Sequence, residues 1–137
     1  MKIIFDTNIF LAASKEGSLS FRILEIVFGE DSGYFVYTSP ALKAELFEKL
    51  IIWDKKNLAG KEKIETLKFL VNNSIAEVIP KERINIIKND PDDNKILECA
   101  IAASANLIIS MDKDLLRLKQ FRNIPIIHPG TFKHYFR

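Results

Sequence analysis

Two acidic residues follow short apolar runs and stand where a parallel sheet would present them to a ligand. Asp6 comes directly after the apolar residues 3–5, and Asp112 lies three residues beyond the apolar residues 107–109. In open parallel sheets, ligands bind at the carboxyl ends of the strands. Both carboxylates are therefore candidates for a shared functional site.

Helical geometry adds two more acids. At about 100° per residue, Glu45 lies on the flank of the apolar stripe of a helix expected from residue 40 to about 53, whereas Glu48 points toward the opposite side. In a second helix, expected over residues 93–105, Asp93 is centred on the core-facing stripe and Asp92 projects away from it. A buried carboxylate without a partner is costly, so Asp93 requires a compensating group.

Four converging carboxylates repel one another and take up protons unless a cation compensates them. Oxygen ligands of high charge favour Mg²⁺ or Mn²⁺ over softer metals. His128 and His134 have no metal-ligand spacing with these acids, and a single cysteine, Cys99, excludes both an intrachain disulfide and a cysteine-based zinc site. A carboxylate site of this kind hydrolyses phosphodiesters by activating water and stabilising an in-line transition state.

The elements that must position these acids alternate along the chain. Ser39 before Pro40 marks a helix start, and Ser18 or Ser20 caps an earlier helix. The alternation of strands and helices favours one α/β domain over residues 1–137, with a mostly parallel sheet of about five strands and helices on both faces. Strands are expected over residues 2–5, 34–37, 75–79, 107–109 and 124–127, and helices over 8–13, 18–28, 40–53, 61–71, 93–105, 112–118 and 132–136, with a short helix or turn at 84–88.

Composition sets the broad class of the protein. The 137 residues are 47% hydrophobic and 28% charged, as in ordinary soluble proteins. One cysteine favours a reducing cytoplasm, and the apolar residues 3–5 are too few for a signal peptide or a membrane span.

The distribution of charge is more informative than the net charge of +2. No acidic residue follows Asp114, which makes the C-terminal stretch basic. That stretch is either a solvated face or a surface that contacts the phosphates of a nucleic acid. Its basic residues are Arg117, Lys119, Arg122, Lys133 and Arg137.

Four acidic segments in order resemble those of a known family. The segments are IIFDTNIF, SPALKAEL, DPDDNKILECA and LIISMDKDLL, and the chain closes with IPIIHPGTF. No one of them is specific alone, but together, with their intervals, they resemble the PIN-domain ribonucleases, in particular the toxin-type, VapC-like members. The resemblance spans nearly the whole chain.

The resemblance implies a fold, a site and partners. It implies a three-layer α/β/α sandwich and Mg²⁺- or Mn²⁺-dependent endonucleolytic cleavage of RNA. It also implies a homodimer and a cognate antitoxin, a segment of which lies across the active-site groove. Carried over by position, the metal site consists of Asp6, Glu45, Asp93 and Asp112, with Asp114 as an additional acid and Thr7, Asn8 and Ser110 as supporting polar residues.

Other interpretations remain open at this stage. Asp6, Asp93 and Asp112 could each cap the helix that follows, and Glu45 could be a surface residue. The chain could also be a non-catalytic module that binds RNA or a protein. An aspartyl-phosphate enzyme is disfavoured, because Asn8 stands where its second aspartate is expected and no glycine-rich phosphate loop is present.

Overall fold

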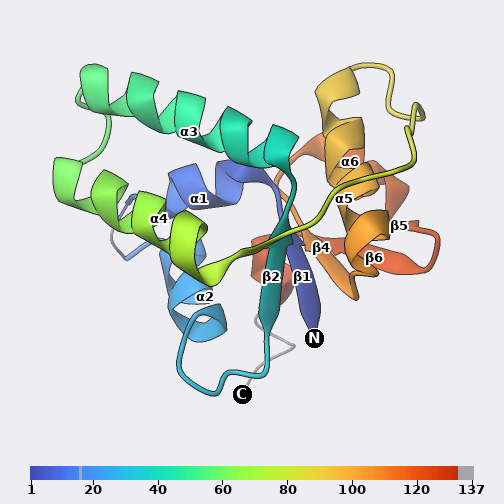
Figure 1. Cartoon of the computed structure of the whole chain (residues 1–137), viewed down its shortest axis with the longest axis horizontal. Helices are drawn as coiled ribbons and strands as arrows, with labels where there is room; N and C mark the ends of the chain where they lie inside the picture. The colour runs from blue at the N-terminus through green and yellow to red at the C-terminus, as the bar shows by residue number, and fades with distance from the viewer. Residues whose placement is uncertain (16, 133–137) are drawn as a thin grey trace.

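The computed structural model describes residues 1–15 and 17–132, and its strands form one twisted sheet (Figure 1). In this part of the chain the strand order is β3-β2-β1-β4-β6-β5. All neighbours pair in parallel except β5 and β6, which are antiparallel. The strands are β1 (Lys2–Phe5), β2 (Phe35–Thr38), β3 (Ala76–Glu77), β4 (Leu107–Ile109), β5 (Gln120–Phe121) and β6 (Ile124–Ile127).

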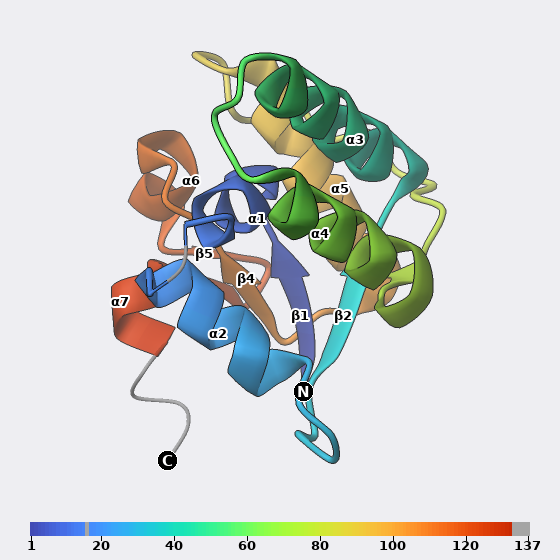
Figure 2. The same ribbon diagram turned by 90° about the vertical axis from the view of Figure 1, so that its left-hand side faces the viewer.

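Helices cover both faces of the sheet, as Figures 1 and 2 show. Helices α5 and α6 pack on one face, and α1, α2, α4 and α7 on the other. The predicted α/β/α sandwich is thereby confirmed. The helices are α1 (Thr7–Ala13), α2 (Leu19–Val27), α3 (Pro40–Lys55), α4 (Lys61–Ser74), α5 (Asn94–Ala103), α6 (Lys113–Leu118) and α7 (Pro129–Phe132), with a 3₁₀ turn, η1 (Pro91–Asp93), before α5.

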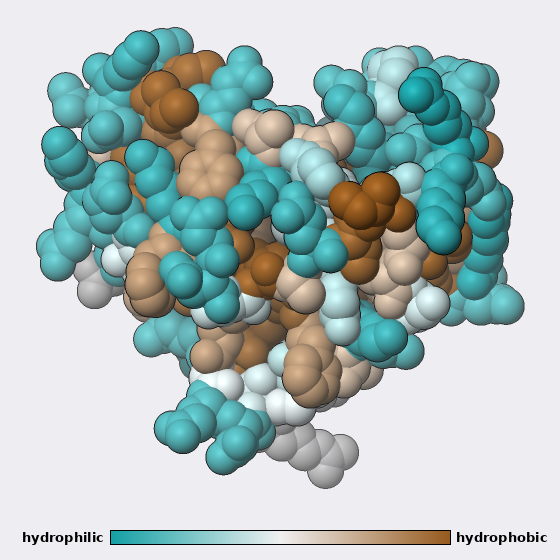
Figure 3. All heavy atoms as spheres, in the orientation of Figure 1, coloured by the Kyte–Doolittle hydropathy of each residue, from teal (hydrophilic) through white to brown (hydrophobic). Residues whose placement is uncertain are grey.

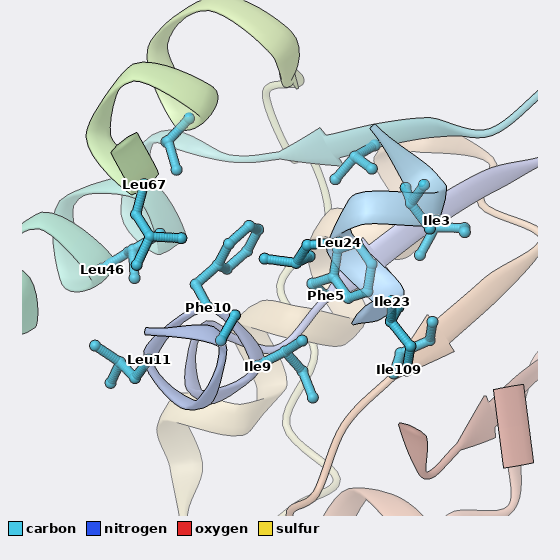
Figure 4. Packing of buried hydrophobic residues seen from close by; sticks show 14 of the residues in the cluster. Ile3, Phe5, Ile9, Phe10, Leu11, Ile23, Leu24, Leu46, Leu67 and Ile109 are labelled. Carbon is cyan, nitrogen blue, oxygen red and sulfur yellow. The ribbon is translucent and has the colours of Figure 1, made fainter. Parts of the chain in front are cut away.

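The alternation of side chains along β1 divides the core in two. Ile3 and Phe5 belong to the cluster under α1 and α2, whereas Ile4 belongs to the cluster under α5. All three are buried, as expected for the central strand of a parallel sheet. In Figure 4 Phe10 of α1 points between the leucines of α3 and α4 and the residues of β1. Its ring packs edge to face against that of Phe5, with the ring centroids 5.6 Å apart.

Helix α3 passes over the carboxyl edge of the sheet and contacts both cores. Leu42, in its first turn, packs in the cluster under α5. Leu46 and Leu50, one and two turns later, pack in the cluster under α1 and α2. Ser39 caps this helix by accepting a hydrogen bond from the Leu42 N–H at 3.3 Å, as its position before Pro40 predicts.

The sheet has one more strand than the sequence pattern predicts. Strand β5 pairs with β6 through a tight turn in which Arg122 and Asn123 have positive φ angles of 48° and 70°. Neither residue is a glycine, so the usual signal of such a hairpin is missing from the sequence. The strand expected over 75–79 is also shorter, at Ala76–Glu77.

The expectation of a helix or turn at residues 84–88 is wrong. The segment is irregular because its N–H groups bond to side chains of α5 instead of to preceding carbonyls. Glu98 accepts from the Ile84 N–H at 3.0 Å, and Asn94 accepts from the N–H groups of Ile86 and Ile87 at 3.1 and 2.9 Å. We call residues 79–90 the strap, since they run from β3 along α5 to the 3₁₀ turn (Figure 1).

Two further differences lie at helix ends. The helix expected from Asp93 begins one residue later, after the 3₁₀ turn. The helical turn expected over 132–136 meets α7 at Phe132, and its remaining residues lie outside the described part of the chain. Among the described residues, no helix combines the length and apolarity needed to cross a bilayer.

Asn94 should contribute strongly to stability because its buried amide satisfies four groups. Besides accepting two bonds from the strap, it donates to the carbonyls of Ile87 and Pro91 at 2.9 and 3.0 Å. Asn94→Ala should lower the free energy of unfolding by about 2–4 kcal/mol, since it leaves buried polar groups unpaired. Urea denaturation measures this change.

The matched control is Asn73→Ala, on the exposed surface of α4, where the amide makes one bond to the Phe69 carbonyl. It should change the free energy of unfolding by less than about 0.5 kcal/mol. Equal effects of the two substitutions would show that the strap is not held by Asn94.

Candidate metal centre

Asp6 lies at the carboxyl end of β1, where the sheet holds its backbone. Its N–H donates to the Ile109 carbonyl of β4 at 3.0 Å, which extends the parallel ladder by one residue. Its side chain is 5% exposed and accepts from the Asn8 N–H at 3.4 Å, so it also caps α1. Thr7 places its hydroxyl 3.5 Å from the same carboxylate oxygen.

Ser110 connects Asp6 to Asp112. Its hydroxyl donates to Oδ2 of Asp6 at 2.7 Å and accepts from the Asp112 N–H at 2.9 Å. Ser110 is completely buried, and its own N–H bonds to the Ile127 carbonyl of β6 at 3.0 Å. One hydroxyl therefore fixes the relative positions of acids on β1 and after β4.

Asp112 caps α6 and belongs to a group of three carboxylates. Its Oδ1 accepts from the N–H groups of Asp114 and Leu115 at 2.8 and 3.4 Å. One carboxylate oxygen each from Asp90, Asp93 and Asp112 lies within 4.8 Å of the other two. Capping and clustering are thus compatible, because a carboxylate has lone pairs enough for both.

Asp93 is the least satisfied member of this group. It is 8% exposed, and its Oδ2 is buried without a hydrogen bond from any described residue. The adjacent polar group is Asp112, which can bond to Asp93 only if one of the two carboxyls carries a proton. Burial, followed by this interaction with Asp112 and repulsion by Asp90 and Asp6, raises the pKa of Asp93 to about 8.

Asp6 feels the same environment less strongly. Burial raises the pKa of Asp6 above its usual value, and the charge of Asp112 adds to the increase. The hydrogen bonds from Ser110 and the Asn8 N–H, with the charge of Lys49, act in the opposite direction. Two carboxyls at one edge of the sheet are thus harder to ionise than in water, which is the condition that a bound cation would relieve.

Glu45 reaches this edge from α3 in the company of a lysine. Lys49, one turn further along, lies 3.2 Å from Glu45 and 3.4 Å from both the Thr7 hydroxyl and the Asn8 amide oxygen. Glu45 is outside the group formed by Asp90, Asp93 and Asp112. Its assignment as a metal ligand stays a prediction, and the ammonium of Lys49 is its partner in the present arrangement.

The remaining predicted residues surround this group. Asp114 lies 3.5 Å from the Asn89 amide and 3.5 Å from Arg117, so its carboxylate is engaged outside the group of three. Arg122 is bound to Glu82 of the strap, and Lys119 is exposed at the end of α6. Contacts between these three basic residues and RNA stay predictions.

Asp90 was missed by the sequence analysis. It lies in a polar loop before Pro91, where no periodicity indicates the direction of a side chain. The 3₁₀ turn brings it to the group, since the Asp93 N–H bonds to the Asp90 carbonyl at 3.0 Å. An acid three residues before a predicted ligand, across a proline-led turn, is the signal that could have identified it.

The carboxylates suit a hard divalent cation. All candidate ligands are oxygens, the buried Oδ2 of Asp93 has no donor among the described residues, and burial together with neighbouring carboxylates raises the pKa of Asp6 and of Asp93. In Figure 3 the outline of the molecule is notched between the lobe that holds α3 and the lobe that holds α5 and α6.

A parallel sheet between two helical layers, with acids at its carboxyl edge, defines the class of protein. The chain belongs to the PIN domain family, whose model matches residues 2–114. A chain in the crystal structure of VapBC2 from Rickettsia felis, bound to a DNA fragment from their promoter, has a similar fold. The TM-score is 0.60 at 16% identity, over 93% of this chain and 98% of that one. No curated protein sequence matches significantly.

The raised pKa of Asp93 predicts how stability depends on pH when no metal is present. Between the unperturbed value of 3.8 and about 8, the folded protein holds a proton on Asp93 that the unfolded chain releases. The free energy of unfolding contributed by this group therefore falls as pH rises through that interval. Asp93→Asn removes the effect, so in chelator the variant should gain stability over the wild type as pH rises.

Thermal unfolding across this interval measures the difference. Asp92→Asn is the control, because Asp92 is 70% exposed and pairs with Lys95 at the surface. A difference between wild type and Asp93→Asn that stays constant with pH would show that Asp93 does not hold a proton.

Ser110 should govern metal affinity through the carboxylates that it orients. Ser110→Ala removes the bond to Asp6 and the acceptor for the Asp112 N–H. The Kd for Mn²⁺ should rise by roughly tenfold or more, as when outer-shell partners of a metal site are lost. Ser110→Thr keeps the hydroxyl and should bind Mn²⁺ much as the wild type does. Calorimetric titration of both variants decides the matter, and an unchanged Kd in Ser110→Ala would count against the assigned role.

Proposed function

We propose that this protein is a divalent-metal-dependent endoribonuclease, the toxin of a toxin–antitoxin pair, acting in the cytoplasm. The observation that carries the proposal is the buried, unpaired Oδ2 of Asp93 beside Asp90 and Asp112. In a protein that binds no cation at this place the arrangement would be unfavourable, because each buried carboxylate without a compensating charge lowers the free energy of unfolding. Membership of the PIN domain family supports nuclease activity at the level of the class.

The proposed metal ligands are Asp6, Asp93 and Asp112, with Glu45 completing the set from α3. Asp90 joins them as an acid that the sequence pattern did not indicate. Mg²⁺ or Mn²⁺ bound there would polarise a phosphodiester and lower the pKa of a water for in-line attack. Ser110, Thr7 and Asn8 hold the carboxylate of Asp6 so that both of its oxygens are oriented before the metal arrives.

Lys49 supplies positive charge on the α3 side of the same edge. Its ammonium lies between Glu45, Thr7 and Asn8, within reach of solvent at 35% exposure of its side chain. A cation there lowers the electrostatic cost of bringing a phosphate toward a group of acids. Basic residues on and after α6, including Arg117, Lys119 and Arg122, are further proposed contacts to the RNA.

The proposed partners are an RNA substrate, a cognate antitoxin and a second copy of the chain. The structural likeness to a chain of the VapBC2 complex supports a partner protein for this fold. The notch between the two lobes in Figure 3 is the proposed place for a strand of RNA or for an inhibiting segment.

Loss of either central aspartate should abolish cleavage. Asp6→Asn and Asp93→Asn keep size and hydrogen-bonding capacity but remove a charged ligand, which costs more than the 10–100-fold typical of an outer-shell partner. We expect cleavage to fall by more than roughly a hundredfold. The assay uses a quenched fluorescent single-stranded RNA with Mg²⁺ or Mn²⁺, and with chelator as the metal-free reference.

Circular dichroism shows whether each variant is folded, and Asp92→Asn serves as the neighbouring control with an exposed carboxylate. Wild-type rates in Asp6→Asn or Asp93→Asn would refute the assignment. Absence of cleavage in the wild type, together with no binding of Mn²⁺ by calorimetry, would favour a non-catalytic binding module.

A further inference from the structure

A groove borders the strap and the 3₁₀ turn that contains Asp93. It has a volume of about 610 Å³ and is formed by the start of α3 on one side and by the strap and α5 on the other. Pro91 and Asn94, which lie on either side of Asp93 in the chain, are part of its lining. The groove and the candidate metal centre thus share the corner between the 3₁₀ turn and α5.

Some charged side chains of the groove have a partner in the structure and others do not. Glu82 is bound to Arg122 from the β5–β6 hairpin, and Glu98 accepts the Ile84 N–H. Lys95 pairs with Asp92 at 3.3 Å. Lys81 and Arg83 are exposed, and their side chains make no hydrogen bond or ion pair with any described residue. Glu98 keeps its negative charge when it accepts an N–H, so Lys81, Arg83 and Glu98 remain once the two ion pairs are set aside, and the groove is net positive.

The strap that carries these two cations is held in place. Asn94 and Glu98, one turn apart on α5, make four hydrogen bonds to its backbone. Three are accepted from N–H groups, and the fourth is donated by Asn94 to the Ile87 carbonyl. Ile84 and Ile87 are buried under it and anchor it in the cluster beneath α5. Glu82, between the two cations, is bound to Arg122, and Ile84, directly after Arg83, is the first anchored residue, so the backbone is held on both sides of Arg83. In Figure 3 hydrophilic side chains cover the outer part of this side, and a hydrophobic patch lies nearer the middle of the face.

We propose that this groove binds the phosphates of the single-stranded RNA on one side of the cleaved bond, with Lys81 and Arg83 as their contacts. The inference rests on the proposed function, because it extends the path of the same substrate. A polyanion that reaches the acids of the metal centre must be attracted by charges nearby. Lys81 and Arg83 are two cations without a partner among the described residues, in a groove that adjoins the 3₁₀ turn of that centre. The contact is to the backbone, so it is independent of RNA sequence.

The test measures binding without cleavage. In chelator, fluorescence anisotropy of a labelled single-stranded RNA gives the Kd for the wild type and for Lys81→Ala/Arg83→Ala over a series of salt concentrations. Loss of two phosphate contacts should raise the Kd by roughly tenfold or more and reduce the slope of log K against log salt by about 1.4, at about 0.7 per phosphate. The same change is expected for two RNAs of different sequence.

Lys55→Ala/Lys56→Ala is the matched control. It removes the same charge from the opposite end of α3, where both lysines are exposed (Figure 1). This control should keep the wild-type Kd and slope to within a small change from net charge. Lys81→Arg/Arg83→Lys, which keeps both charges, should bind RNA as the wild type does.

Three outcomes overturn the proposal. The first is equal Kd values and slopes for Lys81→Ala/Arg83→Ala and the control. The second is the absence of salt-dependent RNA binding by the wild type in chelator. The third is that Lys81→Ala/Arg83→Ala loses affinity for a polyglutamate peptide, measured by the same method, while its RNA binding is unchanged. The last would make the groove a contact for an acidic protein. Cleavage is assayed separately with metal, so a protein that binds RNA here but never cuts it refutes the proposed function and leaves the groove assignment intact.

Discussion

Repulsion among carboxylates is the constraint on which the arrangement of this fold depends. Asp90, Asp93 and Asp112 approach within 4.8 Å of one another, and Asp6 lies near enough to raise the pKa of Asp93 further. Such a group spreads apart unless its backbone is fixed by stronger interactions. Here the sheet ladder holds Asp6 and Ser110, and α6 and the 3₁₀ turn hold Asp112 and Asp93.

The cost of this arrangement is limited by how the acids are distributed among the elements. Asp6 and Asp112 accept hydrogen bonds at helix N-termini, so each carboxylate gains hydrogen bonds and a favourable helix dipole. Asp93 accepts no such hydrogen bond, and burial raises its pKa to about 8. Positive charge comes from Lys49 on α3 and from Lys81 and Arg83 on the strap. Under the proposed function, these cations attract a polyanionic substrate toward the acidic site.

Local signals were sufficient where a residue's role depends on its neighbours in the chain. Buried strands read as continuous apolar runs, and Ser18 and Ser39 marked helix starts that the structure contains. Asp93 could be placed on the buried side because helical periodicity is regular. The sequence did not predict local structure that depends on contacts with residues distant in the chain. The strap is irregular because Asn94 and Glu98 replace the backbone as its hydrogen-bond partners, and nothing in residues 84–88 indicates this. Asp90 and the β5–β6 hairpin were missed for a local reason, since a non-repetitive turn and positive φ at Arg122 and Asn123 leave no periodic pattern.

The order of strands has a consequence for the synthesis of the protein. β1 is central in the sheet, yet its neighbour β4 follows about a hundred residues later, and the bond from Ser110 to Asp6 spans 104 positions. A nascent chain that has left the ribosome up to α4 holds Asp6 and Glu45 but neither Ser110 nor the acids of the 3₁₀ turn and α6. Pairings so distant in sequence form late in folding, because loop closure must precede them. The acidic edge therefore assembles only after most of the chain has been translated, and a ribosome-bound fragment cannot carry out its chemistry.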